Sequence, residues 1–133
     1  MKKRTYPRNG YTLMEIIITV IILGVIVSLA VPNYTMSVEK TKAAEGAQML
    51  EALLNAQRRY QIEYGVYAND LNNLDIEFTA GTNNFNMPTL STNPSQLASI
   101  ERRNGDYILS IDSQGSIVCN NADLCPKLGY KVP

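Results

Sequence analysis

One apolar stretch dominates the sequence, and with the residues around it this stretch reads GYTLMEIIITVIILGVIVSLAVP at positions 10–32. From Leu13 to Val31 the only ionisable side chain is that of Glu15. A helix over this stretch rises about 1.5 Å per residue, which is enough to cross the roughly 30 Å hydrocarbon core of a bilayer. The sequence therefore predicts a single membrane-spanning helix near the N-terminus.

The charges around this stretch are distributed unevenly. The first ten residues contain four basic residues and no acid, namely Lys2, Lys3, Arg4 and Arg8. Basic residues beside a membrane span hold their end in the cytoplasm, so the hundred or so residues after the span are expected on the other side. The formal net charge is zero, but the chain after its first ten residues has eight basic and twelve acidic residues, a net charge of −4.

Length and composition exclude several classes of protein. At 133 residues the chain is the size of one domain, too short for a multidomain enzyme or a polytopic membrane protein. It contains no histidine, the usual general base and commonest metal ligand. No nucleophile lies beside a base, no glycine-rich phosphate loop is present, and Asp106, Asp112 and Asp123 lack the spacing of a calcium loop. We expect neither an enzyme nor a cofactor or metal.

Two simpler explanations of the apolar stretch are a cleaved secretory signal peptide, with Ser28 and Ala30 before the cut, and a plain signal anchor. Glu15 argues against both. A charged residue inside a membrane helix costs about 2.5–3.5 kcal/mol on insertion scales, and neither a disposable leader nor a tether has a use for it. An ionisable residue in this position indicates a function and a partner.

A helical pattern resumes after Pro32 and predicts an amphipathic helix over residues 33–64, ended by Gly65. Its apolar stripe has steps of four, three, four and four residues: Met49, Leu53, Ala56, Tyr60 and Tyr64. Charged residues fill other positions and are expected in solvent: Glu39, Lys40, Lys42, Glu45, Glu51, Arg58, Arg59 and Glu63. With the membrane segment, the whole helix would be about 80 Å long, so its first half must be buried in lipid or among other copies of the chain.

The remaining chain predicts a loop and a small sheet. Residues 65–95 are rich in Asn, Thr, Gly, Pro and Ser, which indicates a surface loop with one turn of helix. Residues 96–119 predict three antiparallel strands, joined by a two-residue type I′ turn at Asn104-Gly105 and by a second turn at residues 113–115. Inward-facing positions of the middle strand, Tyr107, Leu109 and Ile111 or their alternates, would pack on the helix.

The chain contains two cysteines, Cys119 and Cys125. Their spacing is not that of a C-x-x-C redox motif, and the compartment beyond the membrane is oxidising. We therefore expect a structural disulfide that pins the C-terminal region, residues 119–133, to the last strand. This tail shows no recognisable regular pattern.

The string Gly10-Tyr11-Thr12-Leu13-Met14-Glu15-Ile16, after a short basic leader and before an apolar helix with Gly24 and Pro32, resembles the N-terminus of type IV pilins and pseudopilins. The resemblance joins leader charge, glycine, glutamate, apolar helix and later proline at fixed spacing, and it covers about residues 1–64. Tyr11 stands where the family most often has Phe. The family fold is α+β, a long N-terminal α-helix packed on a small antiparallel β-sheet.

Residue by residue, the resemblance implies that a prepilin peptidase removes residues 1–10 by cleaving between Gly10 and Tyr11, and that the new Tyr11 amine is N-methylated. Residues 11–32 would form the transmembrane and assembly helix, and residues 33–133 the globular domain. In the family the carboxylate at the position of Glu15 is thought to pair with the N-terminal amine of a neighbouring subunit. Gly24 and Pro32 would bracket a stretch that unwinds locally in filaments.

The resemblance implies a structural subunit of a type IV pilus or related extracellular filament, a helical homopolymer assembled by inner-membrane machinery. The subunit would reside in the inner membrane before assembly and on the bacterial surface afterwards. A minor pilin or a type II secretion pseudopilin is the alternative, although the disulfide favours a pilin. A membrane-anchored binding module, for example for DNA uptake, is more distant. It would rely on a basic patch of Arg102, Arg103, Lys127 and Lys131, which is more simply a solvated surface because the chain after residue 10 is acidic overall and the patch has no aromatic residue beyond Tyr130.

Overall fold

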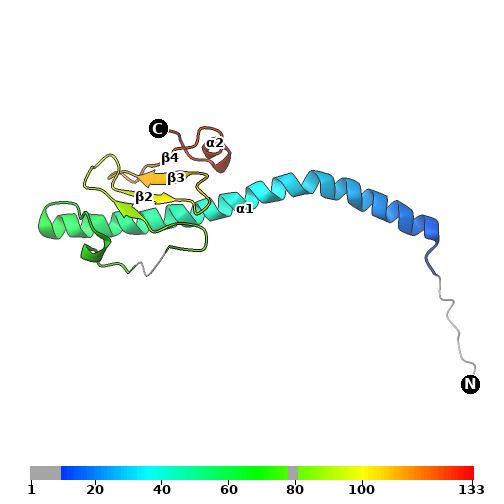
Figure 1. Ribbon diagram of the computed structural model, residues 1–133, viewed down its shortest axis with the longest axis horizontal. Coiled ribbons are helices and arrows are strands. Elements are labelled where there is room, and N and C mark those ends of the chain that lie inside the picture. The colour runs from blue at the N-terminus through cyan, green and yellow to red at the C-terminus, as the bar shows by residue number, and fades with distance from the viewer. Residues whose placement is uncertain (1–9, 78–80) are drawn as a thin grey trace, which may run out of the picture. The chain divides into compact units, whose positions relative to one another are not determined.

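A computed structural model describes residues 10–77 and 81–133 and is shown in Figure 1. The chain divides into two compact units, one up to Thr35 and the other from Met36 to Pro133. Helix α1 (Leu13–Tyr64) contributes to both units, and every strand belongs to the second. The class is α+β, a long apolar-to-amphipathic helix with a small antiparallel sheet, as the sequence predicts.

Helix α1 begins and ends with local hydrogen bonds that its sequence encodes. The hydroxyl of Thr12 accepts a hydrogen bond of 3.2 Å from the amide of Glu15, which is the N-cap arrangement of a T-x-x-E sequence. At the other end Gly65 has a φ of 77° and its amide donates to the carbonyl of Gln61. The left-handed conformation favours glycine, so the helix ends where the sequence places its glycine.

The second unit is built on one face of α1. The buried helical residues recur at steps of three and four: Ala43, Gly46, Leu50, Leu53, Leu54, Ala56 and Gln57. The predicted stripe agrees at Leu53 and Ala56, but it was wrong at its end because Tyr64 is 59% exposed. The buried face of α1 begins at Ala43, earlier in the chain than the predicted stripe, because its first two buried residues are the small Ala43 and Gly46.

The sheet has four antiparallel strands in the order β1-β2-β3-β4 (Figure 1). Their bounds are Thr89–Leu90, Ala98–Glu101, Ile108–Ile111 and Ile117–Cys119. Tyr107, Leu109 and Ile111 are all buried, as predicted. The expected loop over 65–95 does contain one helical turn, η1 (Leu71–Asn73), but it also contains β1. The sheet therefore begins before residue 96, and a strand of two residues is too short to produce a readable alternation.

The turn between β2 and β3 differs from the predicted two-residue type I′ turn. The last paired residues are Glu101 and Ile108, so the connection is longer. Gly105 has a φ of 78°, whereas Asn104 has an ordinary negative φ. The Gly105 amide donates to the carbonyl of Arg102 at 2.7 Å, which closes a turn that needs positive φ only at its last residue. The Arg102 amide also donates to the Tyr107 carbonyl at 2.9 Å, so the turn consists of the residues between these two.

Phe85, in the region expected to be a surface loop, is completely buried. A Cβ atom built on Gly46 would lie 2.7 Å from Cζ of the Phe85 ring, so the helix has a glycine where this ring packs against it. The ring also meets Tyr107 edge-on, with centroids 6.2 Å apart. An isolated aromatic residue among polar ones gives no periodic signal, so only the tertiary structure identifies Phe85 as a core residue.

A buried amide fixes the chain where it leaves α1. The Gln57 side chain donates to the carbonyl of Ala68 at 2.7 Å and accepts from the amide of Ala68 at 2.8 Å. Both residues are almost fully buried. The two hydrogen bonds satisfy a backbone segment that has no strand partner there.

We expect Gln57→Leu to destabilise the second unit by about 2–3 kcal/mol, because a buried amide and carbonyl would each lose a partner. Gln48→Leu is the matched control, since Gln48 is an exposed glutamine on the same helix. The measurement is the free energy of unfolding of the full chain in mild detergent. Equal effects of the two substitutions would contradict the assigned role of Gln57.

The C-terminal region is attached at several points. Cys119 and Cys125 are joined by a disulfide with 5.7 Å between their Cα atoms. Cys125 opens a short helix, α2 (Cys125–Leu128), which the sequence analysis did not predict. The Tyr130 hydroxyl donates to the carbonyl of Ala43 at 3.3 Å, and the Lys131 carbonyl accepts from the Cys119 amide. The tail therefore packs on both the sheet and α1.

Candidate functional site

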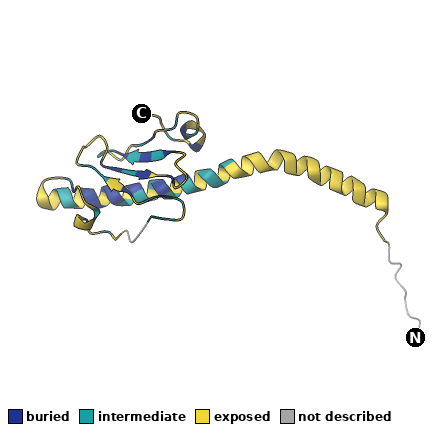
Figure 2. Cartoon of the chain, in the orientation of Figure 1, coloured by how far each residue is buried: buried dark blue, intermediate teal, exposed yellow. Residues whose placement is uncertain are grey.

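The part of α1 that belongs to the first unit is apolar and uncovered, as Figure 2 shows. Every large hydrophobic side chain from Leu13 to Val31 is between 46% and 80% exposed. α1 is long and apolar enough to cross a membrane, and none of its most apolar window is buried. A helix that is hydrophobic on all sides requires lipid or other protein around it.

Most polar side chains of this segment are satisfied by their own helix. The hydroxyls of Thr19, Ser28 and Thr35 donate to the carbonyls three residues earlier, at 2.8, 2.8 and 2.9 Å. Such bonds remove the cost of placing a hydroxyl in an apolar environment. These residues therefore fit a membrane or a packed helical bundle without an external partner.

Glu15 is different. It lies in the first turn of α1, where the partial positive charge of the helix N-terminus favours a carboxylate. Its backbone amide is bonded by Thr12, but its carboxylate has no partner among the described residues. The Glu15 carboxylate, at the edge of an apolar surface, is therefore available to pair with a polar or charged group from outside the described residues.

Gly10 and Tyr11 lie in exposed, non-helical chain, separated from helix α1 by Thr12 alone. Nothing lies within 4 Å of the place where a Cβ of Gly10 would be, and Tyr11 is 79% exposed. A segment of this kind is accessible to a peptidase. The rest of the leader predicted over residues 1–10 lies outside the described residues.

Gly24 and Pro32 lie inside the continuous helix α1, whose residues between them are helical. A Cβ on Gly24 would have open space around it. Pro32 has no amide hydrogen, so the helix lacks one bond to the carbonyl of Ser28. Low helix propensity at one end and a missing bond at the other lower the cost of unwinding this stretch, whereas the structure shows it as continuous helix.

A polar network in the second unit was not expected from the sequence. The Arg102 guanidinium donates to the Glu39 carboxylate, with Nε 2.7 Å from Oε1, and also donates to the carbonyl of Asn84. The Tyr107 hydroxyl donates to the same carboxylate at 3.2 Å. The Arg102 side chain is 8% exposed and that of Glu39 is 19% exposed. This network, which we call the Glu39 cluster, joins α1 to the sheet.

The cluster corrects two sequence-based predictions. Glu39 was expected in solvent, yet it is four residues before the buried Ala43 and continues the helix face that packs on the sheet. That spacing places Glu39 on the packed face, although it does not identify Arg102 as its partner. Arg102 was also expected in a solvated surface or, in the alternative, in a basic patch, and both are wrong because this guanidinium is buried and paired.

The cluster changes the ionisation of its members. The hydrogen bonds from Arg102 lower the pKa of Glu39 below its ordinary value of 4.5 and raise that of Arg102. Burial, together with the neighbouring Glu39 charge, raises the pKa of Tyr107 well above its usual range. All three groups therefore keep their usual charge at neutral pH.

Among the described residues, no three His, Cys, Asp or Glu side chains come together as metal ligands. Two of the three acids considered for calcium, Asp112 and Asp106, have other structural roles. Asp112 accepts hydrogen bonds from the amides of Gln114 and Ser116, which shapes the turn before β4. Asp106 accepts from the side chain of Asn104 in the preceding turn.

Comparison with known proteins found several relatives. The chain is 30% identical over 112 residues to the type II secretion system core protein G of Escherichia coli, a match that covers 80% of this chain and 74% of that protein. It is 32% identical over 81 residues to the protein of the same name from Vibrio cholerae. It is also 36% identical over 72 residues to the type IV major pilin protein PilA of Myxococcus xanthus.

The matches differ in extent. The chain spans 56% of the length of the Vibrio cholerae protein and 33% of the Myxococcus xanthus pilin. No family model matches the chain, and no solved structure matches it. The Escherichia coli match covers too much of the chain to lie within α1 alone, so the similarity includes the second unit.

Proposed function

This chain belongs to the family of type IV pilins and pseudopilins, and from that membership we propose that it is a structural subunit of a type IV pilus or a related extracellular filament. The subunit resides in the inner membrane before assembly. An assembly machinery then extracts it, and it polymerises through the helix of residues 11–32. This role requires no catalytic residue.

The observation that carries the proposal is the uncovered apolar surface of α1 together with the unpartnered acid at its start. Large side chains exposed on every side of the helix are stable in lipid, and equally in a bundle of identical helices. The same surface therefore serves the membrane-bound subunit and the polymer. Because the hydroxyls bond within the helix, Glu15 is the residue left to specify how neighbouring helices are placed.

The partner proposed for Glu15 is the amine that cleavage creates at Tyr11 of a neighbouring subunit. Either charge alone is costly in an apolar interior, and pairing them offsets part of that cost. Only one stagger between adjacent helices brings the two groups together. The pair therefore favours one register of assembly over the others.

A type II secretion pseudopilin is the second candidate. The observation in its favour is the extent of the match to the Escherichia coli core protein G, which covers most of both chains. The disulfide between Cys119 and Cys125 supports the pilin instead. A pseudopilin would form short assemblies inside the envelope, whereas a pilin would be recovered from the cell surface.

One experiment tests the proposal and separates the candidates. Cells are sheared, and the released material is examined by electron microscopy and mass spectrometry. We expect filaments composed mainly of a chain that begins at Tyr11 and is methylated there. A chain recovered only from the membrane fraction, even when overproduced, would contradict filament assembly, and filaments that form only on overproduction would favour the pseudopilin.

Replacing Gly10 by a bulky residue, as in Gly10→Leu, is expected to block removal of the leader, because a peptidase that cuts after glycine has no space for a larger side chain. The measurement is the mass of the protein in the membrane fraction, which should retain residues 1–10. Asn9→Ala is the neighbouring control and should be processed normally. A mature chain starting at Tyr11 in the Gly10 variant would overturn the assignment of the cleavage site.

A further inference from the structure

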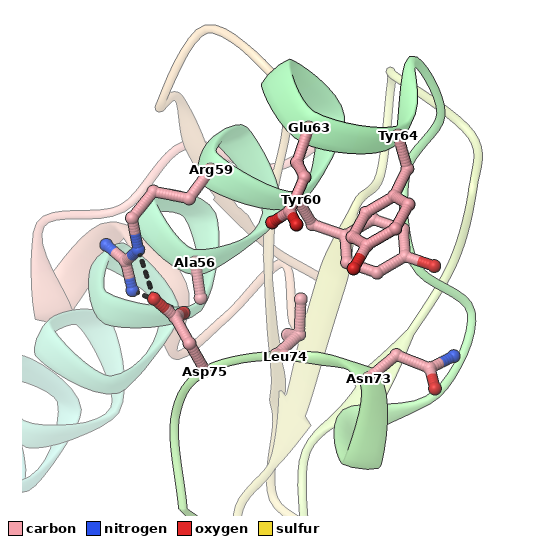
Figure 3. Close-up of a pocket in the computed structure, with 8 residues that line it drawn as sticks. All are labelled: Ala56, Arg59, Tyr60, Glu63, Tyr64, Asn73, Leu74 and Asp75. Carbon is pink, nitrogen blue, oxygen red and sulfur yellow. Dashed lines mark hydrogen bonds and ion pairs between the residues drawn. The ribbon is translucent and has the colours of Figure 1, made fainter.

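A hollow of about 260 Å³ lies beside the last turns of α1, next to the segment that contains η1. Figure 3 shows its side chains: Arg59, Tyr60, Glu63 and Tyr64 come from α1, and Leu74 and Asp75 come from the facing segment. Leu74 is buried and supplies an apolar floor, while the residues around it keep polar groups at the rim. The filament function proposed above makes no use of this feature.

The two tyrosines form an aromatic platform. Their ring centroids are 4.4 Å apart and their planes are inclined by 34°. Tyr60 is half-buried, but Tyr64 is 59% exposed and is not part of the core. A flat aromatic face that the fold does not cover, beside polar groups, is suited to a ligand with one apolar face and polar edges.

The polar groups around this platform can form hydrogen bonds in addition to those they already make. Arg59 and Asp75 form a two-bond ion pair of 2.6 and 2.7 Å, which holds the Asp75 carboxylate in place and leaves further lone pairs on its oxygens. The Asn73 side chain, also at the rim, has no hydrogen-bond partner among the described residues. The Glu63 carboxylate is exposed, and its proximity raises the pKa of the Tyr64 phenol.

The charges of the hollow exclude several ligand classes. Arg59 and Asp75 neutralise each other, so Glu63 leaves a net charge of −1, which disfavours phosphates and carboxylates. A metal ion would find two carboxylates, of which one is already held by arginine, and no third acid, His or Cys is among the lining residues. Small ligands without negative charge remain, and among them the Asn73 amide, which both donates and accepts hydrogen bonds, matches the hydroxyls of a neutral ligand better than it matches an organic cation. The hollow is smaller than the pockets of about 300–1,000 Å³ that hold drug-sized molecules, so it fits a single ring.

We propose that this hollow binds one neutral sugar ring, with the C–H face of the ring on Tyr64 and its hydroxyls bonded to Glu63, Asp75 and Asn73. The proposal goes beyond filament assembly, because each subunit would carry a weak carbohydrate site at the C-terminal end of α1. Many copies in one filament would turn a weak site into firm attachment to a glycan-covered surface.

The test uses the full chain in lipid nanodiscs and saturation-transfer NMR with three neutral probes: methyl β-galactopyranoside, methyl α-glucopyranoside and methyl N-acetyl-β-glucosaminide. We expect transfer to the ring C–H protons of at least one probe, with a Kd on the order of 1–10 mM. Tyr64→Ala should weaken this binding by about tenfold or more, and Glu63→Gln by a smaller factor. Ile62→Ala is the matched control, because Ile62 is 86% exposed on the same turn but does not line the hollow.

Four results would overturn the proposal. The first is the absence of transfer to any probe at about 50 mM, well above the expected Kd. The second and third are equal transfer in wild type and Tyr64→Ala, and equal loss in Tyr64→Ala and Ile62→Ala. The fourth is binding of tetramethylammonium in place of the sugars, which would identify a cation site. Because Tyr64, Glu63 and Ile62 are all exposed, we expect each variant to keep its fold. Circular dichroism of each variant checks this. Filament assembly is scored separately, so loss of sugar binding with normal filaments leaves the proposed function intact.

Discussion

Glu15→Ala is expected to leave the protein in the membrane at its normal level and to reduce filament formation severely. Removing a carboxylate makes insertion easier, because a charge within the bilayer costs about 2.5–3.5 kcal/mol. In the assembled state the same change leaves the neighbouring Tyr11 amine unpaired in an apolar interior. If a penalty of that size falls on each subunit addition, the addition constant drops by about two orders of magnitude.

The measurement compares immunoblots of the membrane fraction with filament counts by electron microscopy, in a strain that lacks the wild-type subunit. The helix N-terminus itself should survive, because Thr12 bonds the backbone amide of residue 15 and not its side chain. Thr19→Ala is the control: it removes a polar group four residues later whose only bond is to its own helix. Normal filament numbers in Glu15→Ala would show that assembly does not depend on the proposed pair.

Glu39→Gln is expected to destabilise the second unit by roughly 3 kcal/mol at neutral pH. This value is at the lower end of the cost of breaking a buried ion pair, because Glu39 is partly exposed. The substitution keeps the shape of the side chain but leaves the guanidinium of Arg102 buried without a counter-charge. Lys42→Ala is the control, since Lys42 contacts Glu39 at 3.4 Å from a more exposed position and should cost less than about 1 kcal/mol.

The effect should also depend on pH in a defined direction. Arg102 holds the folded-state pKa of Glu39 below the ordinary value of 4.5 that applies in the unfolded chain. Its contribution to stability is therefore complete above about pH 4.5 and is lost as the pH falls through the lower folded-state pKa. Urea unfolding of the full chain in mild detergent, followed by the tyrosine near-UV signal, should show wild type and Glu39→Gln converging in acid. A difference that stays constant down to about pH 2.5 would contradict the role of this pair.

The Gln57, Phe85 and Glu39 contacts share one property that kept them out of the sequence analysis. Each joins residues from different segments of the chain, separated by 11 to 63 positions: Gln57 to Ala68, Gly46 to Phe85, and Glu39 to Arg102. In each case the residue type is ordinary for the segment in which it lies. A glutamine on a helix and a lone phenylalanine in a polar loop become informative only when the partner is brought beside them.

The sequence by itself determined the apolar stretch that is long enough to span a membrane, the single acid at its start, the helix end at Gly65 and the family. These features depend on local composition and spacing, because a run of apolar residues and a capping threonine act through their immediate neighbours. The tertiary structure alone decided that β1 pairs with β2, that Arg102 is buried rather than part of a basic patch, and that a hollow with two tyrosines lies beside η1. The physical reason is that burial and pairing depend on which distant segments meet, and a single sequence does not encode that meeting in any local pattern.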